Sequence, residues 1–288
     1  MYKLRGKPER EVRKGEEGVF LISSPPEFLS KNYKENYNRF LTDTSDGKIS
    51  AVLRAFFNKL YAEAFSPEPG ILCRFFSHVF LPAPCPEHIK YGRILDIGCS
   101  SGLFLSHLNQ KWEKYGIEIN KHASTIAMAR GLNVNNCAIE DLDEKQIFDV
   151  IRASHVIEHL PNPDIFFSKC ENILRRGGLL VLYTPNSGTL SRWLFGKYWE
   201  GFYENTHFVI YNLKNLAKIA EKYHFKVLRR RTYYMGIGPS SFLRFLGLNP
   251  AALAGVPLLL FYILFFPISM IESIFNKGEA LMLVFKKQ

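Results

Sequence analysis

Two groups of residues in this sequence have types and spacings that could perform chemistry. The first is LDIGCSSG, residues 95–102, where an aspartate stands close to two glycines. Glycine lets the backbone turn tightly and approach a bound nucleotide-like molecule. The second group comprises the histidines of HVIEHLP, residues 155–161, and His207 in YENTHFVIYN. Because histidine exchanges protons near neutral pH, this group predicts acid–base chemistry.

LDIGCSSG has two interpretations. Gly98 to Gly102 fits G-x-S-x-G, the turn that presents a nucleophilic serine, here Ser100, in α/β hydrolases. That turn needs oxyanion-hole donors from a loop between earlier strands. Upstream of Leu95 the sequence shows only polar and helical patterns, so the serine hydrolase remains the weaker alternative.

The other interpretation is a cofactor loop. Glu118 ends the next predicted strand, 22 residues after Asp96, where a carboxylate can accept hydrogen bonds from both ribose hydroxyls. The dinucleotide fingerprint fails, because Ser100 and Leu103 occupy the places of its second and third glycines. What remains is Asp-x-Gly-x-x-x-Gly, followed by an acid at the end of the second strand.

An alternation of strands and helices from residue 93 onward would position these residues. Short apolar runs predict strands, and runs with helical spacing predict helices. The predicted strands are 93–97, 114–119, 148–154, 179–184, 226–234 and 280–287, and the predicted helices are 103–108, 121–131, 163–178 and 212–225. This order predicts a mostly parallel α/β sheet with helices on both faces.

The region before this alternation divides into two parts. Residues 1–30 are polar and predict a loose arm. Residues 31–90 predict a helical segment, because apolar residues between Ile49 and Ala64 recur at i, i+3, i+4 and i+7. That helix either packs on the core or forms an apolar lid over a substrate site.

The composition indicates which partners and which cellular compartment are expected. The formal charge of +10 suggests an anionic partner, although a basic balance alone means little. The five cysteines form no C-x-x-C pair, which argues against structural zinc or disulfides and favours the cytoplasm. The first twenty residues lack the apolar region of a secretory signal. The basic residues are not interleaved with stacking aromatics, so no nucleic-acid partner is expected.

The stretch RILDIGCSSGLFLSHL, together with YGIEIN, resembles the class I S-adenosylmethionine-dependent methyltransferases. The resemblance continues through CAIEDLD, the long stretch 148–186 and residues 207–228, and covers about residues 91–235 plus the final strand. It is nearest to the subgroup of ubiquinone-biosynthesis and surface-glycan-cluster methyltransferases. One departure is Ser100, where the family more often has glycine. The resemblance implies a Rossmann-like sheet with an antiparallel last strand, S-adenosylmethionine as cofactor, and methyl transfer to oxygen.

The resemblance also implies roles for individual residues. Asp96 would hold the cofactor's α-amino group, Glu118 would take the ribose hydroxyls, and Glu140 or Asp141 would lie by the adenine. The alternative for the last two is a pair of solvated loop acids. The complete set expected to bind the cofactor is Asp96, Gly98, Cys99, Gly102, Glu118, Ile119, Ile139, Glu140, Asp141, Ser154 and His155.

A hydroxyl acceptor must lose a proton, and His207 or His159 would take it. His207 is slightly favoured as base or orienting group, whereas His159 could instead fix its loop. HVIEH also matches the zinc motif H-x-x-E-H, but Pro161 and Pro163 argue against the continuous helix that this motif needs, so no metal is expected. Nearby aromatic residues either wall an acceptor pocket or anchor a loop; they are Trp199, Phe202 and Tyr203.

Residues 245–271 contain no charged side chain and are long enough to span a bilayer. They belong to an insert, 236–278, between the last two strands of the core. A single crossing would leave residues 279–288 on the opposite side of the bilayer from the rest of the core. The pattern therefore predicts a helical hairpin in one leaflet. Its alternatives are a buried core hairpin and a dimer interface. The flanking cations, Arg229, Arg230, Arg231, Arg244, Lys277, Lys286 and Lys287, could meet anionic headgroups.

A peripheral position on the inner face of the membrane would suit an apolar or lipid-linked acceptor. A non-catalytic membrane adaptor with the same fold is a further alternative. The sequence leaves the identity of the acceptor and the oligomeric state open.

Overall fold

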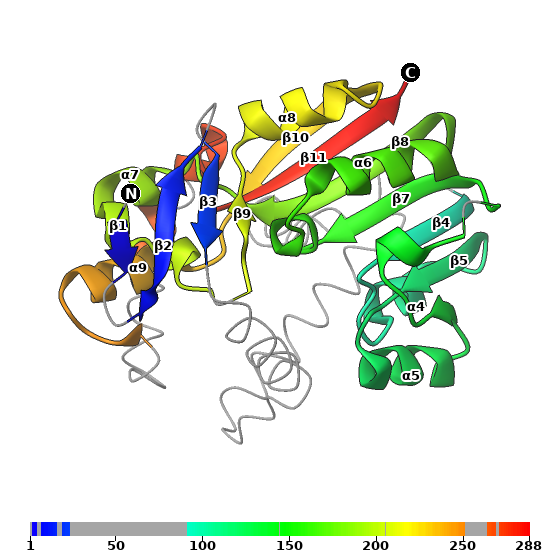
Figure 1. Cartoon of the computed structure of the whole chain (residues 1–288), viewed down its shortest axis with the longest axis horizontal. Coiled ribbons are helices and arrows are strands. Elements are labelled where there is room, and N and C mark those ends of the chain that lie inside the picture. Colours follow the sequence, from blue (N-terminus) through cyan, green and yellow to red (C-terminus); the bar gives the residue numbers. More distant parts are fainter. Residues whose placement is uncertain are drawn as a thin grey trace.

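The computed structural model describes residues 2–4, 7–15, 19–23, 91–143, 145–204, 206–250, 264–268 and 271–288. In these ranges the chain forms a large sheet with helices on both faces and a smaller sheet at one end (Figure 1). The helical segment predicted at 31–90, including the helix between Ile49 and Ala64, lies outside the described residues.

In the described ranges the large sheet has seven strands, ordered β10-β11-β8-β7-β4-β5-β6. The four neighbouring pairs from β8 to β6 are parallel, and β11 is antiparallel to both β10 and β8. The strands are β4 (Gly92–Ile97), β5 (Trp112–Ile117), β6 (Asn133–Asn135), β7 (Phe148–Ser154), β8 (Leu174–Pro185), β10 (Phe225–Tyr233) and β11 (Ala280–Lys287). This confirms the predicted mostly parallel α/β sheet with a reversed last strand.

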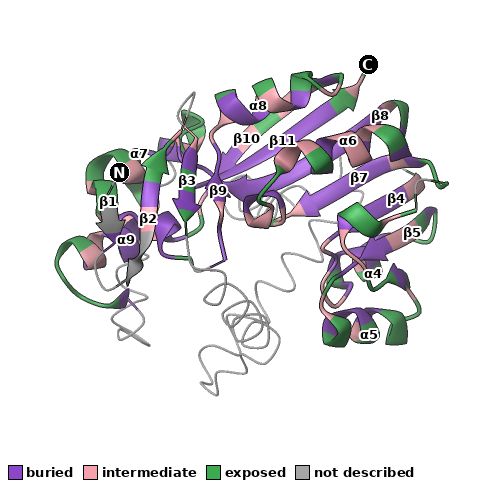
Figure 2. Cartoon of the chain, viewed as in Figure 1, coloured by how far each residue is buried: buried purple, intermediate pink, exposed green. Residues whose placement is uncertain are grey.

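The core lies on both faces of this sheet, because successive strand side chains point to opposite sides. Leu95 joins a cluster with Phe166 of helix α6 (Pro163–Ile173), whereas its neighbour Ile94 joins a second cluster with Phe104 of helix α4 (Leu103–His107). The central strands are therefore buried along most of their length, while the helices expose their outer sides (Figure 2).

Six α-helices are defined in the described ranges: α4 (Leu103–His107), α5 (Lys121–Ala129), α6 (Pro163–Ile173), α7 (Leu190–Phe195), α8 (Leu213–Glu221) and α9 (Ile237–Phe245). Short 3₁₀ helices are η2 (Ile139–Asp141), η3 (Ile157–His159), η4 (Gly196–Tyr198) and η5 (Glu200–Phe202). The helix predicted at 163–178 ends at Ile173. Leu174 is extended there and pairs with Phe148, so its neighbours through Gly178 belong to β8.

The smaller sheet corrects the prediction of a loose arm at residues 1–30. Its strands are β1 (Tyr2–Leu4), β2 (Lys7–Lys14), β3 (Phe20–Ser23) and β9 (Val209–Ile210), in that order. Val12, Phe20 and Ile22 alternate with exposed residues and are buried. β3 pairs with β9, a partner nearly 190 residues away in sequence, and this pairing gives the polar segment a fixed place.

The insert lies between β10 and β11, as predicted, and begins with α9. Residues 264–268 and 271–274 are also helical. The rest of the predicted leaflet hairpin, 251–263 and 269–270, lies outside the described residues. Among the helices that the structure describes, none has the length and apolarity needed to cross a membrane.

Candidate active site

The glycine loop follows β4 and bends over the end of β5. Gly98 and Gly102 have φ values of 69° and 75°, in the left-handed region that favours glycine. A Cβ atom on Gly98 would lie 2.6 Å from Val156 Cγ2, so no larger residue fits without movement. The backbone N–H groups of Gly98 and Cys99 both donate to the Ile117 carbonyl, which fixes the loop to the neighbouring strand.

Glu118 lies directly against this loop. Its Oε2 accepts a hydrogen bond from the Ser100 N–H at 2.9 Å, and its Oε1 accepts one from the Asn120 N–H at 2.8 Å. The side chain is buried, yet two backbone donors leave lone pairs on both carboxylate oxygens for further donors. Ile119, the next residue, is half exposed and offers an apolar surface beside the carboxylate.

Asp96 is directed at the protein rather than at open space. Its Oδ1 accepts a hydrogen bond from Arg152 Nη1 at 2.7 Å, and its side chain is 1% exposed. The Arg152 guanidinium also stacks 4.0 Å from the centroid of the Phe104 ring. Burial raises the pKa of Asp96, and Arg152 opposes that rise. Arg152 thus balances the charge of Asp96, and the expected contact of Asp96 with the cofactor's α-amino group, directly or through water, stays a prediction.

Cys99 is part of the core under the loop. Burial raises the pKa of its thiol, with further contributions from Asp96 and Glu118, so the thiol stays protonated. A Cβ atom on Gly116 would approach Cys99 Sγ to 2.6 Å, which shows how closely the thiol packs on β5.

The residues expected at the adenine and cofactor edges come from the loops after β6 and β7. Ile139 is buried on η2, while Glu140 and Asp141 beside it are exposed. Ser154 ends β7 and is half-buried, and His155 follows with a φ of 55°. The structure brings the glycine loop and Glu118 together and leaves the two acids of η2 open to solvent.

A second cluster forms after β7, around Glu158 on η3. Glu158 is fully buried; its Oε1 lies 3.0 Å from His155 Nδ1, and its Oε2 accepts from Thr184 Oγ1 at 3.0 Å. Burial alone would raise its pKa, but the hydrogen bond from His155 and the charges of the nearby histidines lower it to about 2. Glu158 is therefore a carboxylate at neutral pH.

The structure brings His159 and His207 together, with ring centroids 4.9 Å apart. His159 Nδ1 lies 3.0 Å from the Thr206 carbonyl oxygen. Because a carbonyl only accepts, the proton of neutral His159 is assigned to Nδ1, which leaves the lone pair on Nε2. Burial, together with His159, lowers the pKa of His207 to about 4, so His207 is neutral at pH 7.

Glu158, His159 and His207 could also hold a metal ion. Each offers one ligand atom, and these atoms lie within 4.8 Å of one another. Imidazole nitrogens with one carboxylate are ligands that Zn²⁺ and similar ions accept. The zinc motif in the sequence pairs His155 with His159, whereas in the structure His159 lies beside His207, from the loop before β9.

Sequence reasoning missed Thr184 and Tyr211 in this cluster. The Tyr211 hydroxyl is buried without a hydrogen-bond partner among the described residues. Burial raises its pKa, and the Glu158 charge adds to that rise. Both residues lie in apolar runs of the sequence that are typical of core strands. Only their position beside Glu158 in the structure indicates that they belong to this cluster.

Trp199, Phe202 and Tyr203 do not wall a pocket. Their exposed fractions are 0%, 0% and 4%, and they form the core of the smaller sheet with Phe20 and its neighbours. Trp199 Nε1 donates to Ser191 Oγ at 3.2 Å. They anchor the loop that carries His207, which was the alternative interpretation.

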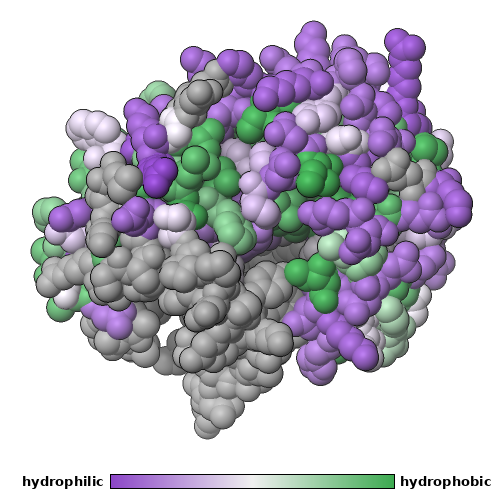
Figure 3. Space-filling model, viewed as in Figure 1, coloured by the Kyte–Doolittle hydropathy of each residue, from purple (hydrophilic) through white to green (hydrophobic). Residues whose placement is uncertain are grey.

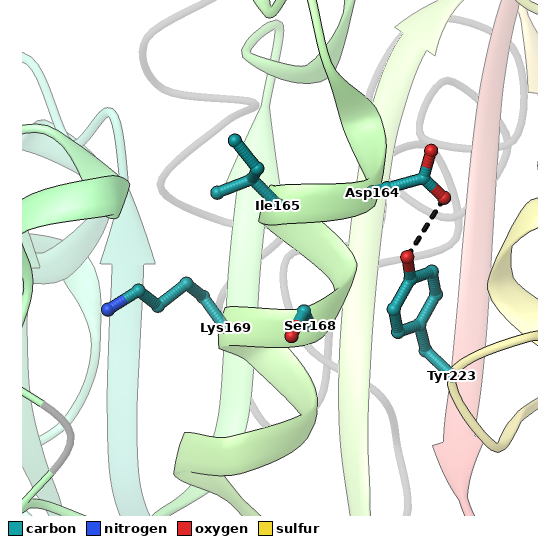
Figure 4. Close-up of a pocket in the computed structure, with 5 residues that line it drawn as sticks. All are labelled: Asp164, Ile165, Ser168, Lys169 and Tyr223. Carbon is teal, nitrogen blue, oxygen red and sulfur yellow. Dashed lines mark hydrogen bonds between the residues drawn. The ribbon is translucent and has the colours of Figure 1, made fainter.

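A shallow pocket on the outer side of α6 is a separate feature (Figure 4). It has a volume of about 320 Å³, and Tyr223 donates to Asp164 Oδ1 at 2.9 Å on its wall. Its lining residues, Asp164, Ile165, Ser168, Lys169 and Tyr223, include none from the glycine loop or the histidine cluster. The candidate active site is a different region, at the carboxyl ends of β4, β5 and β7, where parallel sheets bind ligands.

Comparison with known proteins agrees with this geometry. Residues 28–230 match the family described as "Methyltransferase domain". A ubiquinone biosynthesis O-methyltransferase from Rhodopseudomonas palustris is 30% identical over 122 residues, which cover 40% of this chain and 47% of that protein. The enzyme of the same name from Sinorhizobium fredii is 33% identical over 113 residues, covering 35% and 44%. The match thus spans about half the length of these curated relatives.

Among solved structures, a SAM-dependent methyltransferase from Thermotoga maritima superposes with a TM-score of 0.50 at 19% identity. It covers 91% of this chain and 99% of that one, and at this identity the likeness concerns the fold.

The chain belongs to the methyltransferase domain family, and its fold is that of the class I S-adenosylmethionine-dependent methyltransferases. It is an enzyme of this class, with S-adenosylmethionine as cofactor, as the resemblance implied. Family and fold favour the cofactor interpretation of the glycine loop over the serine hydrolase alternative with Ser100 as nucleophile.

The residues present fit this cofactor. The loop between Gly98 and Gly102 has the tight backbone that close approach requires. Glu118 has acceptor capacity left for a ribose diol, and Ile119 offers an apolar contact for an aromatic base. These residues would hold the cofactor between the glycine loop and the end of β5.

Proposed function

We propose that this chain transfers the methyl group of S-adenosylmethionine to a hydroxyl oxygen of an apolar or lipid-linked small molecule. The observation that carries the proposal is the His159–His207 pair beside the Glu158 carboxylate, at the same sheet edge as the glycine loop. The names of the O-methyltransferases with which the chain shares 30–33% identity support oxygen as the accepting atom.

The cofactor supplies a methyl group already activated on a positively charged sulfur, so the protein's work is positioning and proton transfer. The glycine loop and Glu118 hold the donor. His159 would accept the hydroxyl proton on Nε2 while the acceptor oxygen takes the methyl group and the bond from methyl carbon to sulfur breaks. The products would be a methyl ether, S-adenosylhomocysteine and an imidazolium. The neighbouring Glu158 carboxylate stabilises that imidazolium, and neutral His207 orients the acceptor.

A second arrangement of the same reaction uses Glu158, His159 and His207 as ligands of a divalent cation. The observation favouring it is that their ligand atoms lie within 4.8 Å of one another. A bound cation would lower the pKa of the acceptor hydroxyl, so that its proton could pass to solvent water without a protein base.

The experiment is transfer of an isotope-labelled methyl group to phenols with short and long apolar tails. Mass spectrometry of the product identifies the methylated atom. Methyl ether formation that requires Glu118 supports the proposal. A folded protein that binds S-adenosylhomocysteine but methylates only nitrogen, or no acceptor in the set, would contradict it and would favour another acceptor class or the adaptor alternative.

A further inference from the structure

A layer of large exposed apolar side chains covers α7, α9 and the segment that returns to β11. We call this the apolar face, defined by Trp193, Leu194, Phe245, Leu246, Leu248, Leu264, Ile268, Ile271, Ile274 and Phe275. Each is between 47% and 71% exposed. Figure 3 shows apolar atoms at the edge of the molecule where α7 and α9 lie. Clustered exposure of this kind marks an interaction surface, since isolated apolar residues are normal but patches are not.

The elements of the apolar face pack together through aromatic rings. Phe195 of α7 lies 6.2 Å from the ring centroids of both Phe242 and Phe245 of α9. Phe242 in turn lies 5.5 Å from Phe265. The helices α7 and α9 and the helical residues 264–268 therefore pack as one layer.

Buried carboxyl groups fix this layer to the core. Glu272 accepts from the Ser191 N–H at 3.0 Å, at the start of α7. Glu279 accepts from the Met235 and Ile237 N–H groups at 2.8 and 2.9 Å, at the start of α9. Because both helices are held by their first turns, their outward apolar side chains are a fixed feature of the fold.

The exposed charged side chains on the described elements of the apolar face are cations. Arg244 is paired with Glu200, and the acids of this layer, Glu272 and Glu279, are buried. Lys197 and Lys277 are exposed. Apolar side chains rimmed by cations suit a bilayer surface with anionic headgroups. A second copy of the chain would bring the same exposed lysines together, with no exposed acid on the described elements of this face to oppose them.

The apolar face also connects directly to the candidate active site. Ser241 Oγ of α9 accepts a hydrogen bond from the Glu200 N–H at 2.8 Å, and Trp199 bonds to Ser191 of α7. The stretch from η4 through η5 leads within a few residues to His207. Both helices of the apolar face thus pack against the segment that carries an acceptor-side histidine.

We propose that the apolar face binds an anionic lipid bilayer, at the cytoplasmic side of a membrane, and that the acceptor is a hydroxylated amphiphile taken from that bilayer. The acceptor part rests on the proposed function, whereas lipid binding does not. Each buried apolar side chain adds favourable transfer free energy, and the exposed lysines add electrostatic attraction that salt weakens.

The test is flotation of the full chain with vesicles of phosphatidylcholine alone and of phosphatidylcholine with phosphatidylglycerol. We expect the wild type to float with the anionic vesicles and to be released by high salt. The double variant Trp193→Glu, Ile274→Glu should reduce the floated fraction at least tenfold. Ile147→Glu is the matched control, since Ile147 is 45% exposed and lies in the loop before β7, away from this face.

Wild type that stays soluble with both vesicle types overturns the proposal, as does a double variant that floats like the wild type. Sedimentation velocity without vesicles provides a further check. If the wild type is a dimer and the double variant is a monomer, the apolar face binds a second copy of the chain. That result would also overturn the proposal. Turnover with a short-tailed soluble acceptor should be equal in wild type and double variant. No turnover in either protein would count against the proposed function, whereas the flotation result would still test lipid binding.

Discussion

Arg152 donates to Asp96 across two neighbouring parallel strands, with Nη1 and Oδ1 2.7 Å apart and both side chains at most 10% exposed. The two residues are register partners of β7 and β4. This pair lies directly under the glycine loop, so the first acid of the cofactor motif is neutralised from within the sheet. Arg152 supports the glycine loop by holding the Asp96 side chain in one position.

Arg152→Met should lower the free energy of unfolding by about 3 kcal/mol, because it leaves a buried carboxylate without its partner. Urea denaturation measures the change. Arg152→Met with Asp96→Asn should recover part of the loss, since the unpaired charge is gone. Lys145→Met is the control, because Lys145 pairs with Asp143 in full solvent contact, and it should change nothing measurable. If Arg152→Met and Lys145→Met change the free energy of unfolding equally, a structural role for the buried pair is contradicted.

Glu118→Ala should weaken S-adenosylhomocysteine binding at least tenfold, as expected when charge-assisted hydrogen bonds are lost. Isothermal titration calorimetry on both proteins checks this. Glu113→Ala provides a matched control, since Glu113 is exposed on β5, the strand that Glu118 directly follows. Wild-type affinity in Glu118→Ala would show that the ribose site lies elsewhere.

His159→Asn should reduce turnover by roughly 10² to 10⁴ while leaving S-adenosylhomocysteine affinity intact, because a general base contributes about this much. His207→Asn should reduce it less, through poorer acceptor positioning. Initial rates with labelled cofactor measure both. Turnover unchanged in both variants would exclude the two histidines from the reaction.

Chelation distinguishes the mechanism in which His159 is the base from the one in which a divalent cation activates the acceptor hydroxyl. If His159 is the base, exhaustive dialysis against EDTA should leave turnover unchanged. Elemental analysis of the purified protein should then find no stoichiometric divalent ion. Turnover lost on dialysis and restored by one divalent ion would instead assign Glu158, His159 and His207 as its ligands.

Glu279 should make stability depend on pH. Burial raises its folded-state pKa to about 7, above the ordinary 4.5, against three backbone N–H donors that favour the charged form. The protonated carboxyl therefore contributes stability in full below pH 4.5, and this contribution is lost as the pH rises through 7. It amounts to on the order of 3 kcal/mol. Urea denaturation from pH 4.5 to 8 should show a smaller decline in Glu279→Gln than in the wild type. Parallel curves would contradict the raised pKa.

The sequence alone determined most of the main sheet and the cofactor loop. Their signals are local: apolar runs of strand length, a helix begun by Pro163, and glycines that follow β4 directly. Glu118 was found for the same reason, since a residue at the end of a parallel strand must lie at the ligand edge.

Only the tertiary structure decided the contacts between distant segments. Nothing local indicates that β3 pairs with β9, that Arg152 balances Asp96, or that His207 meets His159 across 48 residues of chain. The same holds for Trp199, whose aromatic character suits a pocket wall and a core equally well until the smaller sheet covers it. Patterns of spacing specify an element and its buried side, whereas the partner on that side depends on how the elements pack, and packing is a property of the whole chain.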